Sequence, residues 1–470
     1  MQDATKLCRD LQRGTVSAVE TMKETYRRIN AINPELNALV SLLPEADALA
    51  LAAVADEIPS AERGPLHGLP MAPKDAVEVA GFATTQGFVP WADNVARADD
   101  ALAARMRAAG AIFIGHSNMP EFGLGSNTFN SLFGSTKNPY DTTRTPGGSS
   151  GGAAVALATG MLPLADGSDM GGSLRNPASF CNVVGFRPSM GRTPNAKGFG
   201  WFARLATTGP MARTVADTAL LFSIQAGPDA KDPITLPESG ESFLDAVVPH
   251  DDLSGIKIGY APKLHGLPID REVMQVMDRA ADTCANLGAS IVAEGPDLSR
   301  AMDVFHTQRA AALATLGNAL DKSVPNWRDH AKETAIWNIE KGQQLNATEL
   351  IQSELTRTRI YAETARYFSD FDALILPSAQ VPPFPSDVEW IEEIEGETMA
   401  SYIDWMTICC AITVTGCPAL SVPGGFTADG LPVGLQIVGP PRGDLATLKI
   451  GHTFEAATEH YKTAPTIAAF

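Results

Sequence analysis

Residues 122–210 are dominated by glycine, serine, asparagine and proline, and within them only the short run 153–158 is apolar and typical of a helix. Long loops of small residues inside a compact chain are uncommon unless they bind a ligand or carry out chemistry. We therefore expect the functional site to be built mainly from this stretch.

The segments around this stretch alternate between helical and strand patterns. Residues 1–60 are expected to form an N-terminal helical segment, because apolar positions recur there at helical spacing. Further helices are expected at 98–110, 271–287 and most of 299–370, and short buried strands at 111–115, 255–260, 289–293, 371–377 and 435–438. This alternation predicts an α/β fold. No internal repeat or boundary is evident, so we expect one domain, 1–470, with a catalytic core at 61–230 and a variable substrate-pocket region at 235–405.

The composition of the chain argues against several classes of protein. Hydrophobic residues make up 44% and charged residues 19%, which is compatible with a large core. The formal net charge of −18 is spread along the chain, so neither nucleic acid nor an anionic membrane is an expected partner. Because the first residues lack a secretion signal and no apolar run of about 18 residues exists, we expect a cytoplasmic protein. The six cysteines show no CxxC spacing, and no metal or other cofactor is predicted.

The most informative motif is Gly-Gly-Ser-Ser-Gly-Gly at 147–152, directly before the apolar run 153–158. Glycines let the backbone approach a ligand closely, and a helix that begins here places free N–H groups beside Ser149 and Ser150. Such a place favours a developing negative charge. A flexible linker is the alternative, although linkers are not normally followed by a tightly apolar helix. A phosphate-binding P-loop is excluded because its Gly-Lys-Ser/Thr ending is missing.

A second motif, Asp-Met-Gly-Gly-Ser-Leu-Arg at 169–175, places two glycines directly before Ser173. Successive unobstructed N–H groups are what an oxyanion site requires. Taken alone, however, this motif is more often a plain glycine turn.

A third feature is Lys74, which is flanked by apolar residues on both sides of Pro73 and Asp75. A lone lysine is nearly always a solvated surface charge. If it is buried, desolvation lowers its pKa, and the neutral amine can then act as a base.

The block at 147–151 also fits the Gly-x-Ser-x-Gly nucleophile elbow of α/β-hydrolases. That chemistry needs a histidine later in the chain, for which His452 and His460 are the candidates. Both fall in an expected terminal helix rather than a catalytic loop, so a histidine-dependent hydrolase is a less favoured reading.

Taken together, these motifs closely resemble the amidase signature family. The resemblance extends over the lead-in to the lysine at 64–75, the central block at 145–152, 167–175 and 181–189, and two later segments at 209–217 and 416–423. The separations of the lysine and the two serines are also family-like. Any one segment is weak evidence, but all of them in order are strong. The likeness weakens between about 235 and 400.

The resemblance implies a role for each residue that matches the family's motif. Ser173 would be the nucleophile that forms the acyl-enzyme, Ser149 would relay the proton after a cis peptide bond, and Lys74 would be the terminal base. The choice of Ser149 over Ser150 depends on spacing alone. The oxyanion would be held by backbone N–H groups of Met170, Gly171, Gly172 and Ser173, and Met170 departs from the β-branched residue common there.

Other residues are expected to support or line this site. Asp169 and Arg175 are candidates for support behind it, with a purely structural ion pair as the alternative. Gly123, Ser126 and Asn127, on the glycine-rich loop after the strand at 111–115, are expected to bind substrate.

The family fold implied is a mixed β-sheet core covered on both faces by helices. The implied activity is hydrolysis of a carbon–nitrogen amide bond in a small molecule, by a chain acting alone or as a homodimer. The block at 166–181 looks most like the branch of nylon-oligomer and aryl-amide hydrolases. The main alternative is the glutaminase subunit of a tRNA-dependent amidotransferase, although Arg357 and Arg359 lack a convincing setting for glutamine. A non-catalytic relative is disfavoured because all three catalytic residues are present.

Overall fold

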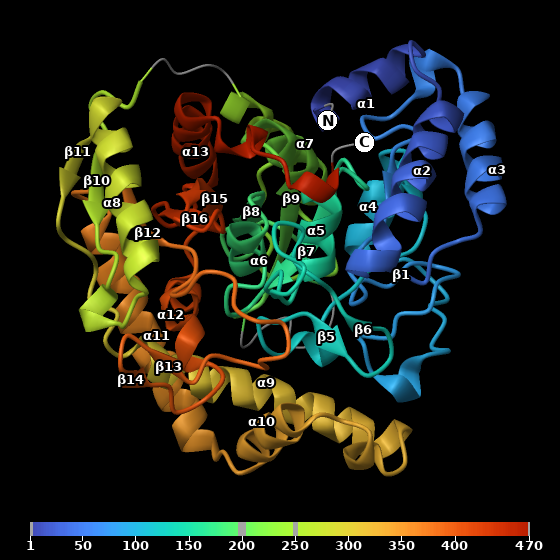
Figure 1. The fold of residues 1–470 in the computed structure, drawn as a ribbon. Coiled ribbons are helices and arrows are strands. Elements are labelled where there is room, and N and C mark those ends of the chain that lie inside the picture. Colours follow the sequence, from blue (N-terminus) through green and yellow to red (C-terminus); the bar gives the residue numbers. More distant parts are fainter. Residues whose placement is uncertain (1–2, 196–203, 248–251, 469–470) are drawn as a thin grey trace.

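An eight-stranded mixed sheet forms the centre of the protein (Figure 1). The computed structural model describes residues 3–195, 204–247 and 252–468. The strand order is β11-β10-β12-β16-β15-β8-β9-β7; the first three strands are parallel and every later pair is antiparallel. The strands are β7 (Ala165–Asp169), β8 (Val184–Arg187), β9 (Thr207–Ala212), β10 (Lys257–Tyr260), β11 (Ser290–Val292), β12 (Ala373–Pro377), β15 (Ala419–Phe426) and β16 (Pro432–Val438).

Helices cover both faces of this sheet, as β12 illustrates. Because successive side chains of a strand point to opposite faces, Ala373 and Ile375 pack into one core with α7 (Val215–Gln225), α8 (Arg271–Asn286) and α13 (Asp444–Thr458). Leu374 and Leu376 pack into another core with α9 (Ala301–Ser323), α11 (Ala347–Tyr367) and α12 (Thr407–Thr415). The predicted α/β fold, with a mixed sheet between two layers of helices, is confirmed.

The N-terminal helices form a third packed unit, beside the β7 end of the sheet (Figure 1). The capping box between Ser17 and Glu20 begins the longest of them, because each side chain satisfies a free backbone N–H of the first turn. These helices are α1 (Ala4–Arg13), α2 (Ala18–Leu36), α3 (Glu45–Asp56) and α4 (Ala101–Ala108), and they pack near α5 (Gly151–Ala158). The remaining helices are α6 (Arg175–Phe180) and α10 (Glu333–Gln343).

Part of the small-residue stretch is sheet rather than loop. Strands β7 and β8 lie within 122–210, and β9 begins there, in a stretch where only one helix was expected. The strand β7 reads Ala-Asp-Gly-Ser-Asp, so it has no apolar alternation by which a strand is recognised. Asp166 and Asp169 are buried and Ser168 is half-buried, and each of them has a hydrogen-bond partner in the site described below.

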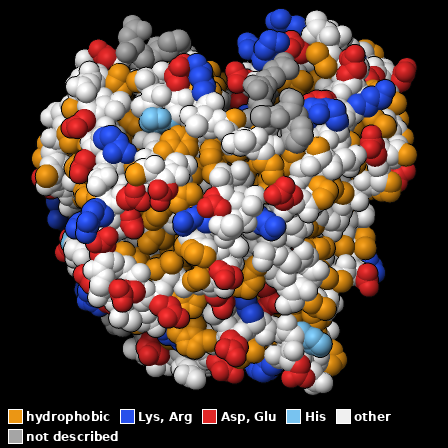
Figure 2. Space-filling model, in the orientation of Figure 1, with side chains coloured by type: hydrophobic (Ala, Val, Ile, Leu, Met, Phe, Trp, Pro, Cys, Tyr) orange, Lys and Arg blue, Asp and Glu red, His pale blue; other side chains and the backbone are white. Residues whose placement is uncertain are grey.

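No helix in the described ranges is long and apolar enough to cross a membrane. On the face of the molecule in Figure 2, the described acidic and basic side chains are interspersed, and no extended basic patch is visible among them.

Candidate active site

Lys74 is held at the centre of the protein by a short parallel pair of strands. β2 (Pro70–Met71) pairs with β3 (Ile112–Phe113), and Lys74 then forms a bridge to Ser117. The lysine is 1% exposed. Its Nζ lies 2.7 Å from the Ser149 hydroxyl, 3.0 Å from that of Ser150 and 3.1 Å from that of Ser168. The amine is therefore surrounded by neutral hydroxyls and buried away from water.

Burial lowers the pKa of Lys74 from its usual 10.5 to about 7, because an ammonium loses its hydration there. The carboxylates of Asp166 and Asp169 oppose this shift, since negative charge stabilises the ammonium. Desolvation is the larger effect. A large fraction of the amine is thus neutral near pH 7, as a general base requires.

Asp166 is the buried carboxyl beside this lysine. It is 0% exposed, and its Oδ2 accepts the backbone N–H of Lys74 at 3.4 Å. The other oxygen, Oδ1, has no hydrogen-bond partner within the described part of the chain. Burial raises the pKa of Asp166 to about 7. Asp166 and Ser168 alternate with Gly167 on β7, so both point to the same side of the strand, toward Lys74.

Ser149 follows a cis peptide bond, formed with Gly148, and lies just before α5. The Ser126 hydroxyl donates to the Gly148 carbonyl at 2.5 Å, and the Thr128 hydroxyl donates to the preceding carbonyl at 2.8 Å. Close packing also explains the glycines here, because a Cβ on Gly152 would lie 2.4 Å from a backbone oxygen. The backbone just before Ser149 is therefore held by two hydroxyl groups from residues 126–128.

The loop between β7 and α6 presents bare backbone N–H groups. Gly172, at φ +108°, donates its N–H to the Asp169 carboxylate at 2.9 Å. Within the described residues, the N–H groups of Met170, Gly171 and Ser173 have no acceptor. In this arrangement three N–H groups are available to an oxyanion, and that of Gly172 is engaged by the carboxylate.

Asp169 and Arg175 form the ion pair that supports this loop. Both are 0% exposed, and their closest charged atoms are 2.8 Å apart. Burial alone would raise the pKa of Asp169, but the guanidinium groups of Arg175 and Arg187 outweigh it and hold that pKa well below its usual range. The carboxylate stays charged, so it can hold the backbone N–H groups of Gly172 and Leu174.

A cavity of about 160 Å³ brings these residues together. The Ser173 hydroxyl borders this cavity, and the described side chains give it no hydrogen bond. Ser149 shares the cavity, whereas the fully buried Ser150 does not line it. The rest of the lining is mostly apolar and consists of Ala76, Gln86, Met119, Phe122, Gly123, Leu124, Gly125, Ser168, Met170, Gly171, Ala206, Phe305, Arg309, Leu313 and Met406.

The three predicted substrate-binding residues occupy two different places. Gly123 lines the cavity, and a Cβ there would lie 3.5 Å from the Ser149 hydroxyl. Ser126 and Asn127 are 2% and 3% exposed and lie beneath its wall. Ser126 holds the cis peptide's carbonyl, and the Asn127 amide donates to the backbone oxygen of Val388 at 2.8 Å.

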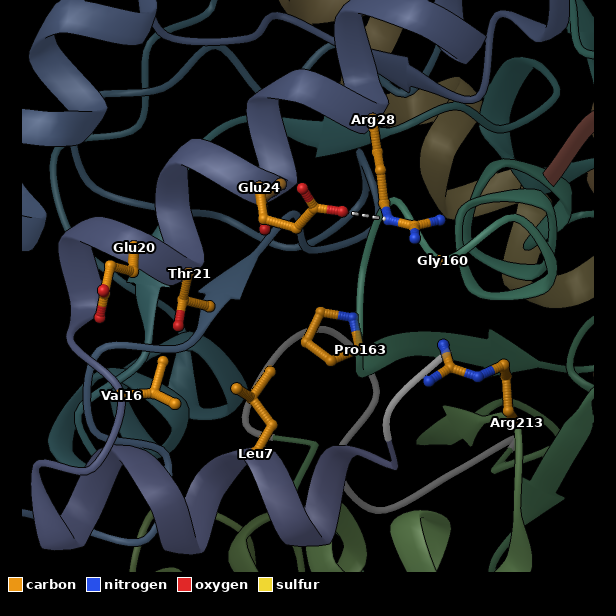
Figure 3. Close-up of a pocket in the computed structure, with 10 residues that line it drawn as sticks. Leu7, Val16, Glu20, Thr21, Glu24, Arg28, Gly160, Pro163 and Arg213 are labelled. Carbon is orange, nitrogen blue, oxygen red and sulfur yellow. Dashed lines mark hydrogen bonds and ion pairs between the residues drawn. The ribbon is translucent and has the colours of Figure 1, made fainter. Parts of the chain in front are cut away.

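Other hollows lack this combination of groups. One of about 330 Å³ lies between α1, α2 and Pro163 (Figure 3), and in it Arg28 pairs with Glu24 at 2.9 Å. Another, of about 670 Å³, reaches Lys74 and Ser168 but is not lined by either Ser149 or Ser173.

The histidines of the rival elbow mechanism lie elsewhere. Of the described histidines, none lines the cavity that holds Ser149 and Ser173. His452 Nδ1 lies 3.9 Å from Glu455 on the same helix, and His460 packs against Phe426. Arg357, considered for a glutamine site, instead donates to Gln308 and to backbone carbonyls outside the cavity.

The Amidase family model matches residues 20–448 of the chain. The chain belongs to the amidase signature family. The resemblance seen in the motifs is therefore confirmed, and the protein is an amidase-family hydrolase.

Relatives of this amidase signature chain include enzymes of two kinds. An acylamidase from Rhodococcus erythropolis is 33% identical over 458 residues, which cover 96% of this chain and 94% of the relative. A glutamyl-tRNA(Gln) amidotransferase subunit from Picosynechococcus sp. is also 33% identical, over 96% of each chain. The crystal structure of a bacterial aryl acylamidase of the same family has a TM-score of 0.89 and 27% identity, covering 100% of this chain and 98% of that one.

Several residues of this amidase signature site were not singled out from the sequence. Ser168 and Asp166 lie in a strand that reads as a loop, although their i, i+2 spacing would place them on one face. Phe305, Arg309 and Leu313 recur every four residues on α9, which is the signal that could have placed them together.

Proposed function

We propose that this amidase signature hydrolase cleaves the amide bond of a small molecule through an acyl-enzyme on Ser173, with Ser149 and Lys74 as its proton relay. The observation that carries the proposal is the buried amine of Lys74, which lies 2.7 Å from the hydroxyl of Ser149, a residue that lines the same cavity as Ser173. A serine hydroxyl is a weak nucleophile unless a neighbouring base removes its proton.

The surroundings of Lys74 suit a neutral amine. Such an amine has two N–H donors and one lone pair, and three hydroxyls lie within hydrogen-bond distance of it. The hydroxyls of Ser150 and Ser168 accept hydrogen bonds from the two N–H groups, while the Ser149 hydroxyl donates to the lone pair. As Ser173 attacks the substrate carbonyl, its proton passes to Ser149 and the proton of Ser149 passes to Lys74.

The reverse transfer completes the acylation step. Lys74 returns its proton through Ser149 to the leaving nitrogen, so the carbon–nitrogen bond breaks and the amine departs. Water then attacks the ester on Ser173 with the same relay as base, and the acid is released. The N–H groups of Met170, Gly171 and Ser173 stabilise the negative oxygen in both steps.

We favour an acylamidase activity that needs no partner subunit. The small, mostly apolar cavity suits a compact acyl or aryl group, and the acylamidase relatives support the same reading. The glutaminase alternative has equal identity among relatives, but Arg357, the arginine considered for its glutamine, lies outside the cavity.

The proposal is tested by labelling and by a panel of amides. A fluorophosphonate is expected to modify Ser173 alone, located by peptide mass spectrometry, and the panel should include anilides, primary amides and glutamine. Turnover of anilides by the purified chain supports the proposal. Glutamine turnover that appears only with a partner subunit would favour the alternative, and no adduct on Ser173 would favour a non-catalytic protein.

Replacing Asp166 by asparagine is expected to shift the acid limb of kcat/KM to lower pH, by on the order of one unit. The Asp166 carboxylate raises the pKa of Lys74, so its removal makes the amine easier to keep neutral. The measurement is a pH–rate profile with a neutral anilide.

Ser168→Ala is the matched control for this variant. It removes a hydroxyl at 3.1 Å from the same amine but no charge, so its acid limb should stay near that of the wild type. An active Asp166→Asn enzyme with an unchanged acid limb would show that this carboxyl does not set the protonation of the base.

A further inference from the structure

One face of α9 places a buried arginine among the residues that line the cavity. Phe305, Arg309 and Leu313 recur at intervals of four residues, so they form one stripe on the helix, and all three line the cavity of Ser149 and Ser173. The two outer positions are apolar. The arginine between them is not explained by the proposed acylation chemistry.

Arg309 is buried without a negative partner. It is 6% exposed, and its guanidinium donates to the Asn338 side-chain oxygen and to the Tyr402 hydroxyl. Within the described residues, no carboxylate lies within 4.0 Å of it, whereas the buried Arg175 pairs with Asp169 at 2.8 Å. Neutral partners fix the orientation of the guanidinium but leave its charge uncompensated, which is costly in a buried place.

The position of Arg309 relates it to the reacting centre. The ring of Phe305 lies against the oxyanion loop, because a Cβ on Gly171 would be 3.2 Å from its Cζ. Arg309 is one helical turn further along α9, a rise of about 6 Å. An anion held by this guanidinium would therefore lie a few carbon atoms from the carbonyl that Ser173 attacks.

A second cation, Lys332, lies near this end of the cavity together with two carboxylates. The Lys332 amine donates to the carbonyl of Leu124, itself a lining residue, at 2.6 Å. The guanidinium and this amine are close enough for Arg309 to lower the pKa of Lys332, although burial is the largest cause of that shift. The carboxylates of Glu121 and Glu389 also act on this amine and raise its pKa, so the charges around Lys332 are of both signs.

We infer that Arg309 binds a carboxylate of the substrate, so that the enzyme selects small amides that carry a carboxylate a few carbon atoms from the scissile carbonyl. The inference rests on the proposed function, since it assigns a substrate class to the same cavity. A planar guanidinium can hold a carboxylate through charge-assisted hydrogen bonds, which compensates the buried charge when substrate is bound.

Two matched pairs of amides test this assignment. The acyl-side pair is glutaryl-4-nitroanilide and pentanoyl-4-nitroanilide, and the amine-side pair is 4-acetamidobenzoate and 4′-methylacetanilide. For at least one pair, the wild type should favour the carboxylate in kcat/KM by at least about tenfold, because charged hydrogen bonds are strong. Arg309→Met should bring that ratio close to one, and Arg309→Lys should retain part of it.

Arg357→Met is the control, because it removes a half-buried arginine next to α9 that does not line the cavity. Its carboxylate preference should equal that of the wild type. A wild type without preference in either pair, or an Arg309→Met enzyme with the full preference, would overturn the inference while anilide hydrolysis still supported the proposed function.

A second measurement tests the carboxylate site even if the proposed function fails. If no anilide is hydrolysed, calorimetric binding of glutaryl-4-nitroanilide to the wild type and to Arg309→Met decides the matter. Binding that is lost only in the variant supports the carboxylate site, and equal or absent binding contradicts it.

Discussion

Ser173→Ala is expected to reduce amide hydrolysis by roughly 10⁴–10⁶-fold, because the variant cannot form an acyl-enzyme. The thermal midpoint should stay close to that of the wild type, since the Ser173 hydroxyl borders the cavity and has no hydrogen-bond partner among the described side chains. The measurement is anilide turnover with calorimetric melting of the same preparation. A folded but inactive variant is the expected result.

Ser150→Ala is the matched control within the same site. Ser150 also lies 3.0 Å from the Lys74 amine, but it is fully buried and does not line the cavity. Its loss should lower turnover by about fivefold, in line with one hydrogen bond of about 1 kcal/mol. If turnover survived Ser173→Ala and disappeared in Ser150→Ala, Ser173 would not be the nucleophile.

The motifs identified Lys74, Ser149 and Ser173 because the residues next to each of them indicate its chemistry. Glycines beside Ser149 and Ser173 mark places where backbone and ligand approach closely, and a lysine in an apolar setting marks an unusual amine. That these segments meet depends on the sheet and on the pairing of β2 with β3, which residue spacing alone does not reveal. The expectation that these segments form one site came from the family resemblance.

Other parts of the site depend on packing between distant segments. The stripe of Phe305 and Arg309 comes from α9, far along the chain and within the region where the motifs weaken. The engagement of the Gly172 N–H depends on where the Asp169 carboxylate points. A helical period identifies a face of a helix, but it does not say against which cavity that face packs.

The polar strand β7 shows a second limit. Buried strands are recognised by apolar residues, yet Asp166 and Asp169 are both 0% exposed here. Asp166 is buried next to Lys74, which lies 92 positions away in the sequence, and Asp169 is buried next to Arg175, only six positions later. Because neither partner is visible in the alternation of the strand itself, the local pattern predicts a loop where the structure has a strand.

Lys74→Met is expected to lower kcat/KM at pH 8 by roughly 10²–10⁴-fold, the usual contribution of a general base. In the wild type, activity should fall as pH decreases through about 7, because the amine with its lowered pKa becomes protonated there. The variant should lack this acid limb, so its deficit should shrink below pH 7. If it kept near wild-type turnover while His452→Ala lost activity, the relay would be wrong and a histidine mechanism right.

The same variant gives a stability test that does not depend on catalysis. In the unfolded chain Lys74 titrates near 10.5, and in the folded protein near 7. Between these values the unfolded state binds more protons, so the free energy of unfolding of the wild type rises with pH. Below pH 7 both states are charged, and the full penalty of a few kcal/mol is present, since a pKa difference of one corresponds to about 1.4 kcal/mol. The stability of Lys74→Met relative to the wild type should therefore be greatest at pH 6 and decline toward pH 10, measured by urea unfolding. A difference that is constant over this range would mean that Lys74 keeps an ordinary pKa and is not the dry amine that the mechanism needs.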